Sequence, residues 1–139
     1  MTQALTPLDQ VIAEAYAHDG SIEAANRVWM TLLRTTLYLP VEPSPPEDPE
    51  EAFRPLTAVV GEHVFLVAFD APARIEDWAA NHTDKIAHVT LTGRDLIAGM
   101  GETVFLALNP GMTFYKEFSP DEVKHLKKIV ARLDQLKNP

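Results

Sequence analysis

The sequence contains no cysteine, which excludes disulfide bonds, thiolate nucleophiles and zinc or iron–sulfur sites built on cysteine. It also lacks an apolar run near the roughly 20 residues that a membrane-spanning helix requires. The N-terminus has neither the basic start nor the apolar stretch of a signal peptide. We therefore expect a soluble, cytoplasmic protein that has no membrane partner.

Catalytic nucleophiles, metal ligands and phosphate-binding loops are poorly represented as well. None of the three serines lies in a G-x-S-x-G motif, and the five histidines lack the H-x-x-x-H spacing of a metal site. The six glycines form neither a G-x-G-x-x-G nor a Walker motif. His88 lies within an expected strand, where a histidine buried in the core is the favoured interpretation. We expect no catalytic residue, no metal and no cofactor, and the sequence favours a protein that is not an enzyme.

The balance of charge is acidic, with a formal net charge of −8 at pH 7. This balance argues against a nucleic acid as partner, because a phosphate backbone attracts basic surfaces. Much of the acidic excess lies in residues 40–55, the proline-rich loop, which holds six prolines and five acids. Proline has no amide hydrogen to donate to a neighbouring strand. We expect this loop to be extended and solvated and not to join a sheet.

Helix caps and apolar periodicity predict five helices. Thr6 and Ser21 are the expected caps of the first two, which form an N-terminal helical hairpin. Ser119 is the expected cap of the last helix, whose six apolar residues fit either a core stripe or a dimer seam. The other two helices are expected at 72–79 and 92–100.

Apolar runs between turn residues predict the strands. They are expected at 36–39, 56–60, 64–69, 86–91 and 103–108, with a short strand after the last of these. The second and third form a hairpin, and the later alternation of strands and helices implies parallel neighbours. The predicted fold is α/β: a single domain over residues 1–139, with a mixed sheet of about five strands, flanking helices and the helical hairpin.

Residues 109–118 carry the candidate binding surface. They begin with a type II turn at 109–112 and follow the carboxyl end of a buried strand, where open α/β sheets bind their ligands. In an extended segment, side chains alternate, so Phe114, Lys116 and Phe118 share one side. Tyr115 and Glu117 share the other. The alternative is that the two phenylalanines cover the edge of the core while the charged residues are solvated. The candidate residues are Asn109, Phe114, Tyr115, Lys116 and Glu117.

Several stretches together resemble the N-terminal domain of the SseB (enhanced serine sensitivity) family. The closing stretches LNPG and KEFSPDE carry most of the similarity, and earlier ones fit the same order. In full they are residues 37–40, 67–70, 75–78, 93–96, 108–111 and 116–122. The resemblance implies a soluble bacterial domain, in a family named after a serine-sensitivity phenotype, and it transfers no activity, cofactor or catalytic residue. Some members carry a second, C-terminal domain, and roles that depend on it are not expected of this chain.

Two functions remain open on the sequence. The first is a non-catalytic protein-interaction module, because the chain lacks catalytic signatures and carries exposed aromatic residues that favour protein interfaces. The alternative is a domain that binds an amino acid or another small metabolite near residues 109–118, with Lys116 on a carboxylate and Glu117 on an ammonium group. Self-association into a homo-oligomer, through a sheet edge or the last helix, is also left open.

Overall fold

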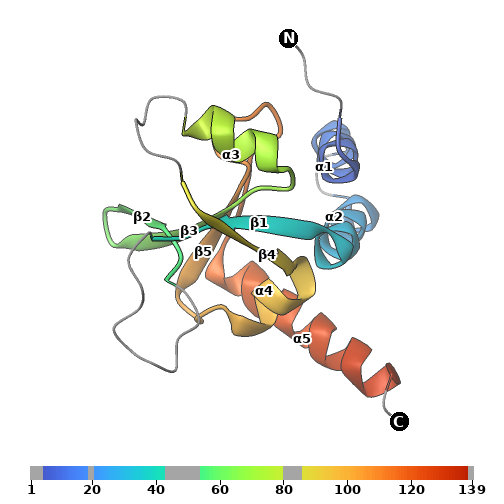
Figure 1. The fold of residues 1–139 in the computed structure, drawn as a ribbon. Coiled ribbons are helices and arrows are strands. Elements are labelled where there is room, and N and C mark those ends of the chain that lie inside the picture. Colours follow the sequence, from blue (N-terminus) through green and yellow to red (C-terminus); the bar gives the residue numbers. More distant parts are fainter. Residues whose placement is uncertain (1–4, 19–20, 43–53, 80–85, 138–139) are drawn as a thin grey trace.

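The computed structural model describes residues 5–18, 21–42, 54–79 and 86–137 (Figure 1). The helices are α1 (Pro7–Ala17), α2 (Ile22–Arg34), α3 (Pro72–Trp78), α4 (Gly93–Gly99) and α5 (Pro120–Lys137). The strands are β1 (Thr36–Pro40), β2 (Thr57–Val60), β3 (His63–Ala68), β4 (His88–Thr92), β5 (Val104–Leu108) and β6 (Lys116–Phe118). Helices and strands alternate through much of the chain, so the predicted α/β class is confirmed. None of the helices in these ranges is long and apolar enough to cross a membrane.

The strands form two sheets instead of one. The larger has the order β2-β3-β5-β6, in which β3 and β5 are parallel and the outer pairs are antiparallel. The smaller is the antiparallel pair β1-β4. The predicted hairpin and parallel pair are confirmed, but β4 pairs with β1 and is not part of the larger sheet. Backbone hydrogen bonds between Tyr38 and Phe69, of 2.7 and 3.0 Å, connect the two sheets.

The ends of the proline-rich loop pair with each other, contrary to the expectation that it joins no sheet. Pro40 is the last residue of β1, and its carbonyl accepts a hydrogen bond from the Leu56 N–H at 2.9 Å. The Glu42 N–H donates to the Arg54 carbonyl at 2.8 Å. Proline lacks a donor, but its carbonyl still accepts, so a proline at a strand end is tolerated. Residues 43–53 lie outside the described residues.

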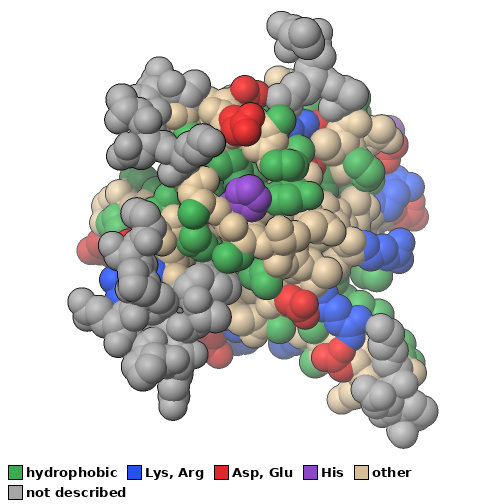
Figure 2. Space-filling view, in the orientation of Figure 1, with side chains coloured by type: hydrophobic (Ala, Val, Ile, Leu, Met, Phe, Trp, Pro, Cys, Tyr) green, Lys and Arg blue, Asp and Glu red, His purple; other side chains and the backbone are tan. Residues whose placement is uncertain are grey.

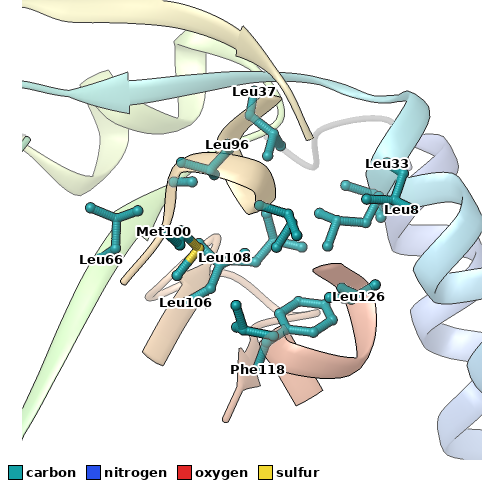
Figure 3. Close-up of a cluster of buried hydrophobic side chains, with 14 of the residues drawn as sticks. Leu8, Leu33, Leu37, Leu66, Leu96, Met100, Leu106, Leu108, Phe118 and Leu126 are labelled. Carbon is teal, nitrogen blue, oxygen red and sulfur yellow. The ribbon is translucent and has the colours of Figure 1, made fainter. Parts of the chain in front are cut away.

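The main core lies between the larger sheet and the helices α1, α2, α4 and α5. Figure 3 shows Leu106 and Phe118 from the sheet together with Leu126 of α5, with Leu8 of α1 and Leu33 of α2 to one side. The apolar stripe of α5 is buried in this core at Val123, Leu126 and Val130, whereas Leu136 near the end of the helix is 73% exposed. Most of the stripe is therefore core. α3 packs on the opposite side of the sheet, where Phe69 and Ile75 form a smaller cluster.

The outer side of the β1-β4 pair is partly exposed. His88 is the first residue of β4, and its side chain lies on the exposed side of the strand. The interpretation of a histidine buried in the core is therefore wrong. The His88 ring contacts that of Tyr38, with centroids 5.6 Å apart. Figure 2 shows hydrophobic side chains gathered on the molecular face over β1 and β4. The core-facing side of the pair carries Leu37 and Leu39.

Candidate functional site

The turn after β5 has the predicted geometry. The Met112 N–H donates to the Asn109 carbonyl at 3.1 Å, and Gly111 has a φ of 81°, as the third residue of a type II turn requires. Asn109 itself is left-handed, with a φ of 55°, which asparagine tolerates better than most residues. This turn sends the chain back along β5 as β6, so the candidate segment becomes the edge of the larger sheet.

Asn109 is fully buried at the carboxyl end of β5. Its Oδ1 accepts a hydrogen bond from the Asp70 N–H at 3.1 Å, which links the carboxyl ends of β3 and β5. Among the residues that the structure describes, its Nδ2 has no hydrogen-bond partner. Asn109 therefore belongs to the interior at the end of the sheet.

A buried ionic network, here called the Arg74 network, adjoins Asn109. It was not predicted from the sequence. The Arg74 guanidinium contacts both carboxylate oxygens of Asp9, with Nη1 3.0 Å from Oδ1, and Nη1 is 2.9 Å from Asp70 Oδ1. Thr6 Oγ1 donates to the other oxygen of Asp70 at 2.5 Å. The three charged side chains are at most 5% exposed. The i,i+4 spacing of Asp70 and Arg74 is the only local sequence signal for it.

The network keeps Asp9 and Arg74 ionised. Burial opposes ionisation of Asp9, but hydrogen bonds from Arg74 and the Thr6 N–H outweigh it and hold the pKa of Asp9 below its usual value. The hydrogen bond to Asp9 in turn raises the pKa of Arg74, against the effect of burial. With two carboxylates on one guanidinium and all three side chains at most 5% exposed, the network attaches α1 to α3 and the sheet.

The rest of the candidate segment alternates as predicted. Tyr115 Oη donates to the carboxylate of exposed Glu117 on one side of β6. On the other side, the Lys116 Nζ lies 4.6 Å from the ring centroid of buried Phe118. Burial and then the neighbouring Glu117 raise the pKa of Tyr115, so its phenol stays protonated as a donor. Phe114 is half-buried against the main core.

Lys116 lines a groove of about 400 Å³ between the helical hairpin and the start of α5, here called the α1–α2 groove. Its apolar lining comes from both helices and includes Ile12, Ala15, Ala25 and Val28. Two large side chains that also line it, Tyr16 and Ile22, are 61% and 71% exposed. The groove is thus an apolar depression with exposed apolar groups beside it.

A polar cluster, the Glu122 cluster, lies at one side of the groove. Glu122 Oε2 accepts a hydrogen bond from the Trp29 indole at 2.8 Å and lies 3.6 Å from Lys116 Nζ. The Trp29 ring also contacts that of His125, with centroids 4.6 Å apart. Trp29 is half-buried and packs against the main core. Its indole N–H needed an acceptor, and that acceptor lies 93 residues away in the chain.

The α1 helix is joined to the candidate segment at this groove. Tyr16 Oη donates to the Tyr115 carbonyl at 2.8 Å. The groove therefore lies where the hairpin, β6 and α5 meet. Of the predicted site residues, Lys116 lines it, Tyr115 borders it through its backbone, and Glu117 faces the other side of the sheet edge.

The family model of the SseB protein N-terminal domain matches residues 8–125 of this chain. The chain belongs to the SseB family. Comparisons with curated proteins and with solved structures gave no match. In this SseB domain, the stretch KEFSPDE supplies both Lys116 and Glu122, so the strongest point of sequence resemblance forms one side of the groove.

Proposed function

We propose that this SseB domain is a non-catalytic interaction module that binds a segment of a partner protein in the α1–α2 groove. The observation that carries the proposal is the exposure of Tyr16 and Ile22, at 61% and 71%, beside the half-buried Trp29. Binding hot spots are enriched in tryptophan and tyrosine and cluster in pockets near the centre of an interface. Single exposed apolar residues are common on monomers, but adjoining ones around a groove are a feature of binding surfaces.

The size and lining of the groove limit the chemistry of the bound segment. A groove of about 400 Å³ accommodates one or two apolar side chains. Among the described residues that line the groove, the only lysine or arginine is Lys116, which donates to the Glu117 carbonyl at 3.3 Å and lies near Glu122. An ammonium group has three donors, so at least one is left for the partner. We expect an apolar side chain followed by a carbonyl or carboxylate oxygen.

Selection of peptides from a random display library on the purified protein tests this proposal. Selected peptides are titrated against protein in which Trp78→Phe leaves Trp29 as the only fluorescent indole. We expect peptide binding to change the fluorescence emission of Trp29. The double substitution Tyr16→Ala and Ile22→Ala should weaken peptide binding at least tenfold, about 1.4 kcal/mol. Leu136→Ala is the matched control, because Leu136 is equally exposed and lies outside the groove lining.

Two outcomes would contradict the proposal. Peptides that bind the groove variant as tightly as the wild type would place the interaction elsewhere. A loss of binding in Tyr115→Ala with Glu117→Ala, but not in the groove variant, would assign it to the other side of β6. Circular dichroism of each variant separates loss of binding from loss of folding.

A small zwitterionic metabolite is the second candidate, supported by the opposite charges of Lys116 and Glu122. A carboxylate would bind the first and an ammonium group the second. The two groups are 3.6 Å apart and already paired, so such a ligand must separate them, which makes the protein segment the preferred occupant. A thermal-shift panel of amino acids tests the alternative, because a ligand at 100 times its Kd stabilises by about 2.7 kcal/mol.

A further inference from the structure

The second surface of interest is the side of the larger sheet that faces away from the main core. Val60 and His63 are paired across β2 and β3, and Phe65 is paired with Phe105 across β3 and β5. Because side chains alternate along a strand, these four residues share one side of the sheet, here called the aromatic face. α3 covers the carboxyl-end part of that side through Ile75, Val67 and Phe69.

Three rings on the aromatic face contact one another. The ring centroids of Phe65 and Phe105 are 4.8 Å apart, and that of His63 is 4.8 Å from Phe105. His63 is exposed, both phenylalanines are half-exposed, and Val60 is 64% exposed. The cluster therefore presents aromatic surface on an open part of the sheet, within the residues that the structure describes.

The charge beside these rings is negative. Glu117 lies opposite Ala107 in the β5–β6 pair, so it is a diagonal neighbour of Phe105 on the same side, roughly 7 Å away. Exposed Glu62 directly precedes His63 in the β2–β3 turn. Lys116 lies on the other side of β6, over Phe118. No residue of the four strands that shares the aromatic face is a lysine or an arginine.

We infer that the aromatic face binds an arginine-bearing segment of a partner protein. A guanidinium group stacks on aromatic rings while it forms planar hydrogen bonds to a carboxylate, and both groups are present here. Tyr115 Oη donates to Oε1 of Glu117, which orients the carboxylate and leaves Oε2 for the guanidinium. A nucleic acid would bring phosphates to Glu117 and Glu62, and a second copy of this face would bring the same carboxylates.

The probe is the blocked peptide acetyl-Gly-Ser-Arg-Ser-Gly-amide, compared with its twin in which citrulline replaces arginine. Both have the same shape, but only the first is charged. Titration of isotopically labelled protein at low salt, followed by NMR, should shift the ring resonances of His63, Phe65 and Phe105 with the arginine peptide. We expect the citrulline peptide to bind at least tenfold more weakly, and the Trp29 indole resonance in the α1–α2 groove not to move.

Variants of exposed residues identify the groups that bind. Glu117→Gln should weaken the arginine peptide about tenfold without changing the citrulline peptide, and His63→Ala should weaken both. Glu23→Gln, an exposed carboxylate on α2, is the matched control and should change neither. Equal binding of the two peptides, shifts confined to other acidic residues, or no effect of Glu117→Gln would overturn the inference. These outcomes leave the α1–α2 groove untouched, because no residue of the aromatic face lines it.

Discussion

The Arg74 network and the Glu122 cluster both pair a cation with a carboxylate, but they differ in burial. The charged side chains of the first are at most 5% exposed, whereas those of Lys116 and Glu122 are 27% and 23% exposed. In the network, one guanidinium contacts two carboxylates from separate helices or loops. In the cluster, a lysine and an indole meet one carboxylate beside an open groove. Similar charged groups thus hold elements of the fold together in the Arg74 network and, we propose, bind a partner in the Glu122 cluster.

This difference also explains where the groove lies. Open α/β sheets commonly bind ligands at the carboxyl ends of their parallel strands. Here Asp70 follows β3 and Asn109 follows β5 at that end, and both are occupied with internal hydrogen bonds. The buried network fills the usual position, and the groove forms instead where the hairpin meets β6. Position in the fold alone would point to the buried network and not to the α1–α2 groove that we propose.

Arg74→Leu should have the largest effect on stability. It would leave Asp9 and Asp70 buried without a positive partner, and such losses cost about 3–5 kcal/mol. Urea unfolding followed by circular dichroism measures the change. Arg27→Leu is the matched control, because the Arg27–Glu14 pair is more than half exposed and should contribute about 0–1 kcal/mol. Equal losses of stability in the two variants would mean that the buried network stabilises the fold no more than the exposed pair does.

The contribution of Asp9 should disappear at low pH. The folded protein holds the pKa of Asp9 below its unfolded value of about 3.9, so folding favours the ionised form. This stabilisation is present above the unfolded pKa and is lost as the pH falls through the folded pKa. Asp9→Asn should therefore be less stable than wild type at pH 7, with a smaller difference at pH 3. A difference in urea midpoint that stays constant between these pH values would contradict the role of Asp9.

Asn109→Ala should destabilise the fold by about 1–3 kcal/mol, because the Asp70 N–H would lose its acceptor inside the protein. Alanine also tolerates the left-handed backbone at this position poorly. Asn109→Gly is the informative partner variant, since it removes the same side chain but accepts the φ of 55°. We expect the glycine variant to be more stable than the alanine variant in thermal unfolding. The reverse order of stability would mean that backbone strain does not contribute to the loss in the alanine variant.

Local signals in the sequence were enough to predict the structure where the interacting groups lie within one turn of each other. The sequence predicts Thr6, Ser21 and Ser119 as helix caps, and each side chain accepts a hydrogen bond from the N–H three residues later. The type II turn and the alternation along β6 follow from the same kind of short-range rule. The pairing of β4 with β1 does not, because it joins residues 48 to 56 positions apart.

The candidate site shows the same limit. Lys116 was within the predicted segment, but most of the residues that line the groove with it come from the N-terminal part of the chain. Trp29 meets Glu122 across 93 residues and Tyr16 meets Tyr115 across 99. No periodicity relates such positions, so the sequence predicts the segment and not the groove. The Arg74 network, in which Asp9 and Arg74 are 65 positions apart, was missed for the same reason.

Lys116→Gln should have the smallest effect on stability and so gives the sharpest contrast with Arg74. Its ion pair with Glu122 is partly exposed and 3.6 Å long, and such pairs contribute about 0–1 kcal/mol. Peptides selected on the α1–α2 groove should nevertheless bind at least tenfold more weakly, because the charged donor is lost. Lys124→Gln, an exposed lysine of α5 outside the groove lining, is the matched control and should change neither quantity. A loss of 3 kcal/mol or more on replacing Lys116, or unchanged peptide affinity, would mean that the Glu122 cluster is structural like the Arg74 network.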